Sequence, residues 1–428
     1  MSRGADSLRL FRLPNFRALW TGQLISIFGD RFTYLALLAL IAERAADPAN
    51  PARELSLIPV VSFLPAILFA PWIGALVDSW NTRATLIVSD AARGVIVLAI
   101  IPAVHAGGLP AGFALVFVLY LANTFFLPAR SAILPDLVPR ERLVEANSLA
   151  TLAGILGTIA GSLAAGWFVE RAGWRLGFAL DAVTYFVSVA ALAMIRWSAP
   201  PEHASRKPAR DAYRALARDV GEGARIALAS APIRGSIGAM ALLWVAGGAL
   251  HVSAPILMEA RGSGMVLGVG RLVALAAVGM VAGTVLLAWR GGRGSAPARL
   301  AISLLGTGAS VLLFAAAPFP WATEIAALLA GAFVVVLLVT TESVLQEATA
   351  AEARARIFAL RDFLARLGVL VSALLFGWLV GGRRLEPAGA ATVSGVLLLA
   401  GGLWGVARLR VGDRGVRARH APGDGVPD

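Results

Sequence analysis

Four residues near the N-terminus have types and spacing that could carry chemistry. They are Gln23, Ile27, Asp30 and Tyr34. Their spacings of four, three and four positions place them on one face of a helix. Asp30 lies within a long apolar run, where a neutral carboxyl is tolerated and a charged one needs water or a cationic partner. Asp30 can therefore act as a reversible proton carrier. The alternative is a structural ion pair with Arg31 or another arginine.

Other charged residues in apolar runs have simpler interpretations. Asp90 and Arg93 are three positions apart, so they can neutralise each other on one helix, and we expect a structural ion pair. Asp181 lies in a further apolar run, and the sequence names no partner for it.

The residue types also exclude several kinds of chemistry. Cysteine is absent, the single lysine Lys207 belongs to no Gly-Lys phosphate-binding motif, and the four histidines have no metal-ligand spacing. We therefore expect no enzyme, no metal and no cofactor. ATP hydrolysis within this chain is excluded on the same ground, so the energy source is an ion gradient or the gradient of the substrate itself.

The elements that position these residues are apolar runs of about 20 residues, the length that a helix needs to cross a bilayer. Twelve such runs are present. They are 16–41, 55–77, 84–104, 113–134, 143–169, 174–195, 233–258, 270–289, 300–317, 321–345, 357–380 and 391–406.

A repeat divides the chain into two halves. The run Gly166-Trp167-Phe168-Val169 returns as Gly377-Trp378-Leu379-Val380, and the same offset aligns Asp136 with Glu347. Each copy holds six apolar runs. A repeat of this size predicts two pseudo-symmetric six-helix bundles around a shared path. The sequence thus predicts an all-α membrane protein with twelve transmembrane helices.

Composition supports a multi-pass protein of the cell membrane whose partner is the lipid bilayer. The chain is 58% hydrophobic and 15% charged, with a mean hydropathy of +0.76, which is too little charge to solvate the surface of a globule. Its net charge of +12 fits cytoplasmic loops better than nucleic-acid binding. With both termini in the cytoplasm, the inner loops hold Arg83, Arg140, Arg142, Arg290, Arg293, Arg299, Arg354 and Arg356.

One long connection separates the halves. We expect a first bundle over 1–197, a cytoplasmic linker over 198–230, a second bundle over 231–409 and a basic, disordered cytoplasmic tail over 410–428. Within the linker, Arg210, Arg214 and Arg218 recur every four residues, which indicates an amphipathic helix on the inner leaflet. That helix is either a lever between the halves or a cationic helix that only sets the topology.

A polar cluster lies between the second and third runs. Its members are Gly74, Asp78, Asn81 and Arg83. Gly74 allows close helix approach, Asp78 can accept hydrogen bonds from a helix N-terminus, and Arg83 can pair with carboxylates. We expect Gly74, Asp78 and Arg83 to form a conformational latch.

At this cluster the sequence resembles the major facilitator superfamily, whose signature loop reads Gly-x-x-x-Asp followed by basic residues. Here Ser79 follows Asp78, and the basic cluster is reduced to Arg83. The stretch 128–139, followed by Ala146-Asn147-Ser148, is similar to the enterobactin-exporter and macrolide-efflux type subfamily. The resemblance covers 15–380 and implies the major facilitator fold and export.

The resemblance also implies which residues line a substrate cavity, because the first, fourth, seventh and tenth spans line it in this superfamily. Together with Gln23 and Tyr34, it nominates Asn123, Thr124, Trp244, His251, Thr340 and Thr341. Many drug-proton antiporters carry an arginine in the middle of the fourth span. Here Arg130 lies nearer the cytoplasmic end, which leaves Asp30 as the best coupling candidate.

These observations predict a monomeric secondary transporter that exports small amphipathic compounds, such as a drug, siderophore or secondary metabolite, by proton-coupled alternating access. Two alternatives remain open. One is a lipid translocator, because the run 67–74 and Gly29-Asp30 also resemble the lysophospholipid transporters of the same superfamily. The other is a membrane scaffold or sensor that transports nothing.

Overall fold

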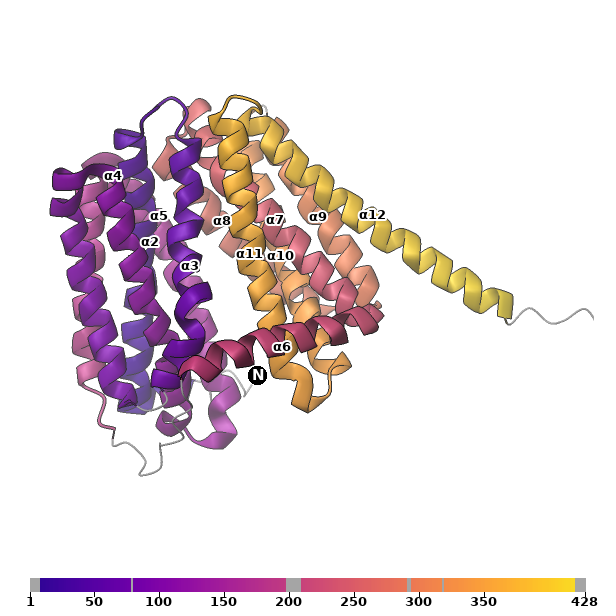
Figure 1. The fold of residues 1–428 in the computed structure, drawn as a ribbon, viewed down its shortest axis with the longest axis horizontal. Coiled ribbons are helices and arrows are strands. Elements are labelled where there is room, and N and C mark those ends of the chain that lie inside the picture. Colours follow the sequence, from indigo (N-terminus) through magenta and orange to yellow (C-terminus); the bar gives the residue numbers. More distant parts are fainter. Residues whose placement is uncertain (1–7, 78–79, 198–208, 291–293, 318, 420–428) are drawn as a thin grey trace, which may run out of the picture.

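The fold is known from a computed structural model of the 428-residue chain. The structure describes residues 8–77, 80–197, 209–290, 294–317 and 319–419. These residues form helices and short connections, with no strand among them (Figure 1). The helices are α2 (Pro14–Arg44), α3 (Ala52–Val77), α4 (Thr82–Leu137), α5 (Leu143–Ala193), α6 (Ala209–Ala229), α7 (Ala231–Ala260), α8 (Met265–Trp289), α9 (Ala296–Ala316), α10 (Pro320–Ala348), α11 (Arg354–Gly381) and α12 (Pro387–Arg419).

Ten helices of the described part are long and apolar enough to cross a membrane. They cover the twelve predicted runs to within two residues at the ends, because α4 and α5 each hold two of the runs. Gly108 in α4 has φ 65°, and Gly173 in α5 has φ 79°. Glycine adopts this left-handed conformation without the steric penalty that a Cβ atom brings. Each glycine therefore breaks its helix between the two predicted runs.

Two ends of the molecule can be distinguished by the position of α6. We call the end at which α6 lies the α6 end and the other the opposite end (Figure 1). The opposite end carries the connections between α2 and α3 and between α11 and α12 (Figure 1). Helices from the two halves of the chain pack against each other as α3 with α11 and as α5 with α8.

Residues of the sequence repeat lie at both of these contacts. Gly377 of α11 packs on α3 so closely that an added Cβ would lie 2.3 Å from the Cβ atom of Ser56. Gly166 of α5 faces Gly270 of α8, where an added Cβ would lie 3.5 Å from the Gly270 Cα atom. The backbones approach so closely at Gly377 because glycine has no side chain, whereas the distance at Gly166 is an ordinary contact. The equivalent glycines of the two copies thus lie where the two halves meet.

Further contacts join the halves at the opposite end. The side-chain amide of Asn50 donates to the carbonyl oxygen of Val380 at 2.9 Å. Asp47 pairs with Arg383 at 3.1 Å, and the backbone N–H of Leu267 donates to Glu170 at 3.0 Å. This end of the molecule is therefore closed.

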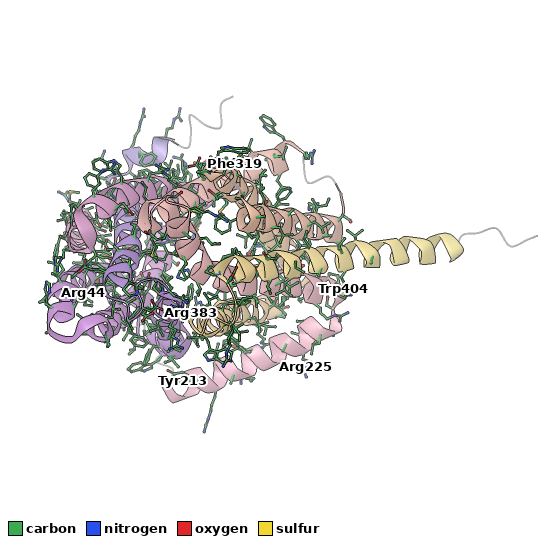
Figure 2. All side chains as sticks on the ribbon, turned by 90° about the horizontal axis from the view of Figure 1, so that it is seen from above. Arg44, Tyr213, Arg225, Phe319, Arg383 and Trp404 are labelled. Atoms are coloured by element: carbon green, nitrogen blue, oxygen red, sulfur yellow. The ribbon has the colours of Figure 1, made fainter. Side chains whose placement is uncertain are left out.

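The predicted amphipathic helix of the linker is α6, and it touches both halves. The Tyr213 hydroxyl donates to the carbonyl oxygen of Leu68 in α3. Glu222 pairs with Arg356 at the start of α11, with an N–O distance of 2.9 Å. Figure 2 shows Tyr213 and Arg225 on α6 along one side of the molecule. Helix α12 continues to Arg419, into the tail over 410–428 that was predicted to be disordered.

Candidate functional site

A cavity of about 540 Å³ lies between the two halves of the chain. Helices α2, α4 and α5 of the first half line it together with α8 of the second. We call it the central cavity. Its lining residues are Gln23, Ile27, Asp30, Arg31, Arg130, Asn147, Ala150, Thr151, Gly154, Ile155, Thr158, Ala277 and Met280.

Asp30 is the carboxylate of this cavity. Its Oδ1 atom accepts a hydrogen bond of 2.6 Å from the hydroxyl of Tyr185 in α5. Among the described residues its Oδ2 atom accepts no hydrogen bond, and the carboxylate joins no ion pair at salt-bridge distance. The structure therefore lacks the pairing with Arg31 that was the structural alternative for Asp30. Neighbouring side chains on a helix point in different directions, which explains why these two do not meet.

A buried polar network lies behind Asp30. Asp181, which is fully buried, accepts hydrogen bonds from Thr33 and Thr184. These two hydroxyls are the partners that the sequence could not name. Gly29 makes room for them, since an added Cβ there would lie 1.8 Å from Oγ1 of Thr184. Gly29 thus allows α2 to lie directly against this part of α5.

The predicted pair of Asp90 and Arg93 is present and fully buried in α4. Asp90 also accepts a hydrogen bond of 2.6 Å from Ser188. The guanidinium of Arg93 lies 4.6 Å from the ring centroids of both Phe126 and Tyr185. Tyr185 therefore connects two groups, because its hydroxyl binds Asp30 while its ring covers Arg93.

Two arginines of the central cavity lack such partners. Arg31 of α2 and Arg130 of α4 make no hydrogen bond to a side chain and no ion pair within the described part of the chain. The Nε atom of Arg31 is also shielded from solvent without a hydrogen-bond partner. Arg130, which the sequence places nearer the cytoplasmic end, shares the cavity with Asp30.

The other nominated residues lie elsewhere. Tyr34 lines a separate cavity of about 270 Å³ together with His251, and their ring centroids are 5.7 Å apart. Asn123 accepts a hydrogen bond of 3.1 Å from Arg93, and Thr124 donates to the carbonyl oxygen of Tyr120. Among the nominated cavity residues, Gln23 lines the central cavity with Asp30.

Three nominated residues from α7 and α10 are packed inside the second half. The Nε1 atom of Trp244 and the hydroxyls of Thr340 and Thr341 are buried without hydrogen-bond partners in the described part of the structure. They are absent from the lining of the central cavity, to which the second half contributes Ala277 and Met280 of α8.

The latch residues are described only in part. Gly74 lies within α3, and Arg83 donates to the carbonyl oxygen of Ala193 at 2.6 Å. Asp78 lies outside the described residues. The latch therefore stays a prediction.

Most of the lining that α5 provides was not predicted from the sequence. Asn147, Thr151 and Thr158 are four and seven positions apart and line one cavity. Their spacing is that of one helical face, so the signal was present. Serine, threonine and asparagine also cap and pack helices, and the spacing does not tell these roles apart.

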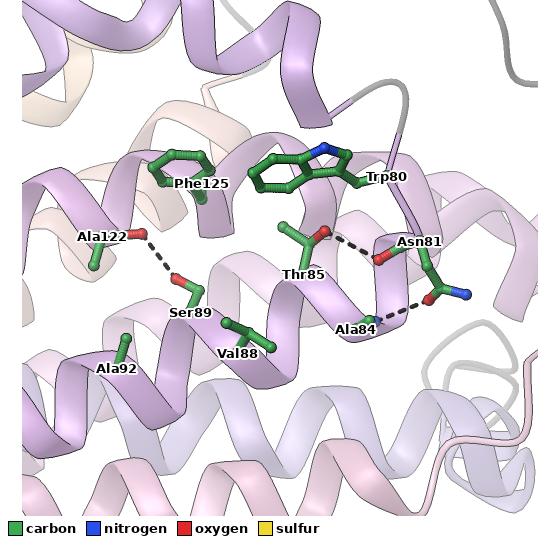
Figure 3. A pocket seen from close by; sticks show the side chains of 9 residues that line it. All are labelled: Trp80, Asn81, Ala84, Thr85, Val88, Ser89, Ala92, Ala122 and Phe125. Carbon is green, nitrogen blue, oxygen red and sulfur yellow. Dashed lines mark hydrogen bonds between the residues drawn. The ribbon is translucent and has the colours of Figure 1, made fainter.

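A further cavity, of about 610 Å³, lies between the two parts of α4 on either side of Gly108 (Figure 3). Trp80 stacks on Phe125 at one side of it, with ring centroids 5.7 Å apart. The Ser89 hydroxyl donates to the carbonyl oxygen of Ala122, and Asn81 caps α4 through the N–H of Ala84. This cavity has no charged lining residue and no contribution from the second half. The central cavity is therefore the better candidate for a transport site.

The comparisons with known proteins agree with this architecture. The model of the Major Facilitator Superfamily matches residues 19–296, which is more than half of the chain. A peptide-transporter-type structure, described as a POT family transporter in complex with 5-aminolevulinic acid, covers 91% of this chain and 95% of its own, with a TM-score of 0.71 and 13% identity. At that identity the likeness shows the fold alone.

Several curated relatives match part of the chain. The putative bacilysin exporter BacE of Bacillus subtilis is 31% identical over 43% of this chain and 44% of its own length. The lysophospholipid transporter LplT of Cronobacter sakazakii is 29% identical over 42% of each. Macrolide efflux protein A of Streptococcus pyogenes is 28% identical over 30% of this chain and 32% of its own. The matched segments span less than half of each relative. The resemblance to exporters of the macrolide-efflux type that the sequence predicts agrees with two of these partial matches.

Proposed function

Because this chain belongs to the Major Facilitator Superfamily, we propose that it is a secondary active transporter that exports small amphipathic compounds by proton-coupled alternating access. One observation carries the proposal. Asp30 presents to a cavity lined by both halves of the chain a carboxylate that has no ion-pair partner among the described residues. An ionisable group inside a membrane segment is a functional candidate by default, and here it shares a space with any molecule that enters.

The proposed topology has twelve crossings. In it, α4 and α5 each cross the membrane twice, with Gly108 and Gly173 at the turns. The long α-helical linker and most loop arginines then lie at the α6 end, which the positive-inside rule assigns to the cytoplasm. Both termini lie on that side.

In this orientation the described state faces inward. The opposite end is closed by the contacts of α3 with α11 and of α5 with α8. Asn147 and Thr151 of the central cavity lie within the first nine residues of α5, on the cytoplasmic side of the membrane. Alternating access requires the contacts at the opposite end to part and the α6 end to close.

A reporter experiment tests the topology. A reporter enzyme fused after Asp428 and a second one placed in the linker over 198–230 are both expected to report the cytoplasm, because the adjoining inner loops are rich in arginine. A reporter inserted between α11 and α12 serves as the external control. A periplasmic or extracellular signal from either of the first two would overturn the span count.

Transport is tested with the full chain in proteoliposomes. A panel of macrolides, cationic dyes, siderophores and dipeptides is offered with and without a pH gradient, and accumulation is measured in each case. We expect at least one compound to accumulate only when the gradient is present. If uptake of every compound is no greater than in protein-free vesicles, the proposal is contradicted.

A lipid translocator is the second candidate, supported by the 29% identity to LplT. The same vesicles test it when they contain a fluorescent lysophospholipid whose external fraction is quenched by dithionite. Movement of this lipid between the leaflets without accumulation of any soluble compound would favour the lipid function.

A further inference from the structure

We propose that the substrate of the central cavity is zwitterionic, with an anionic carboxylate or phosphate held by Arg31 and Arg130 and a cationic amino group held by Asp30. The inference deepens the proposed function and rests on it in one respect, namely that the central cavity is the transport site. It assigns the chemical class of the substrate from the charges that line the cavity.

The positive charges of the cavity have no ion-pair partner among the residues that the structure describes. Arg31 and Arg130 make no ion pair within the described residues, although other partly buried arginines do. Arg361, for example, pairs with Glu342 and Asp362. A guanidinium removed from water needs an anion close to it. Its planar fork binds carboxylates and phosphates with two parallel hydrogen bonds.

Asp30, the acidic residue of the cavity, is held in place but has no ion-pair partner in the described part of the chain. The Tyr185 hydroxyl fixes Asp30 through Oδ1 at 2.6 Å, while the ring of Tyr185 is held by the guanidinium of Arg93. Oδ2 accepts no hydrogen bond from the described residues. A carboxylate in this arrangement offers its free oxygen to an ammonium group.

The rest of the lining indicates the body of the substrate. Ile27, Ile155 and Met280 give apolar surface, while Gln23 and Thr158 give neutral polar groups. A volume of about 540 Å³ is in the range of sites for drug-sized ligands. The cavity thus fits an amphipathic molecule with charges of both signs, such as a peptide-like compound or the headgroup of a zwitterionic lysophospholipid.

The arrangement also gives Asp30 a coupling role. A substrate ammonium and a proton compete for the same carboxylate, so protonation of Asp30 favours release of the substrate. Arg31 and Arg130 bind the other end of the substrate, so the proton and the anionic group do not compete with each other. Competition of this kind is what exchange of a proton for a substrate requires.

A set of four dipeptides of equal apolar content tests the inference. Phenylalanyl-phenylalanine is the zwitterion, its N-acetyl form the anion, its amide the cation, and the doubly capped form is neutral. Binding to the full chain in lipid nanodiscs is measured by isothermal titration calorimetry. We expect the zwitterion to bind most tightly and the cation to bind at least tenfold more weakly. A cation that binds as tightly as the zwitterion would overturn the inference.

Variants assign the two charges. Arg31→Gln and Arg130→Gln are each expected to lower the affinity for the zwitterion and for the anion about tenfold or more, since each removes a charge-assisted hydrogen bond. The affinity for the neutral form is expected to stay unchanged. Arg31→Lys and Arg130→Lys keep the charge and are expected to retain part of the affinity. Asp30→Asn is expected to bring the affinities of the zwitterion and the anion to within twofold of each other.

The control is Arg271→Gln, outside the central cavity. Arg271 lies in α8, is half-exposed and lies 3.9 Å from Glu324. The Arg271→Gln variant is expected to bind all four dipeptides with the affinities of the unmodified chain. If the Arg31→Gln and Arg130→Gln variants also bind the dipeptides with normal affinity, the assignment is contradicted. Thermal unfolding of each variant shows whether a loss of affinity is caused by misfolding.

A lipid arm distinguishes the two sources of the zwitterion. Lysophosphatidylethanolamine carries a phosphate and an ammonium, and lysophosphatidylglycerol carries the phosphate alone. If the first binds tenfold more tightly than the second while the dipeptides do not bind, the substrate is a lipid and the charge assignment holds. Equal binding of the two lipids, without dipeptide binding, would overturn it. Because these are binding measurements, the inference can stand even if no export is found in a pH gradient. Export of a cation alone would overturn the inference but would leave the proposed function intact.

Discussion

Asp30→Asn is expected to abolish accumulation of substrate against a gradient while downhill movement is retained. The amide has the shape of the protonated acid and still accepts the hydrogen bond from Tyr185, but it cannot release a proton. With one proton exchanged per substrate, a gradient of one pH unit supports about tenfold accumulation. The variant is expected to stop at a ratio of about one.

Counterflow and pH-driven transport measured in the same vesicles decide this prediction. Asp362→Asn is the matched control, because Asp362 is an exposed carboxylate that pairs with Arg361 outside the central cavity. A variant at Asp30 that still concentrates substrate would make this residue a structural partner only. Asp181 and His251 would then be the next coupling candidates.

Gly377→Ala is expected to open the contact between α3 and α11 at the opposite end and to slow transport about tenfold. The new Cβ atom would lie 2.3 Å from the Cβ atom of Ser56 and 3.0 Å from the carbonyl oxygen of Ala52, so the two helices must move apart. Overpacking of this kind costs ~1–3 kcal/mol. That cost falls on the closed arrangement of this end and shifts the equilibrium between the two facing states.

The repeat supplies the matched control for this change. Gly166→Ala alters the equivalent glycine of the other copy, where the new atom would lie 3.5 Å from its nearest neighbour, an ordinary contact distance. We expect transport within twofold of the unmodified chain.

Spin labels report the opening directly. The chain has no cysteine of its own, so Asp47→Cys and Arg383→Cys provide the only attachment sites, one from each half. These residues form an exposed ion pair, and the loss of such a pair costs little. Spin–spin broadening is expected to decrease with Gly377→Ala and to persist with Gly166→Ala. Equal broadening in both would show that the close approach at Gly377 does not control closure.

The sequence by itself determined the class of fold. Apolar runs about 20 residues long identify membrane helices because an unpaired backbone cannot lie in lipid. The repeat of Gly166 and Gly377 indicated two related halves before any contact was known. The ion pair of Asp90 and Arg93 followed from a spacing of three residues, since such partners lie on one helix. Each of these inferences depends on local geometry alone.

The composition of the cavity was decided only by the tertiary structure. Gln23, Asp30 and Tyr34 share one face of α2, but this face contacts different helices at different heights. Gln23 and Asp30 therefore meet α5, whereas Tyr34 meets His251 of α7.

The position of Arg130 in the sequence, near the cytoplasmic end of its span, suggested that it lies away from Asp30. In the structure it lines the same cavity as Asp30. Asp181 accepts a hydrogen bond from Thr33 of α2, which is 148 positions away in the sequence. Proximity between residues a hundred or more positions apart depends on how the helices cross. The spacing within a single helix carries no information about that crossing.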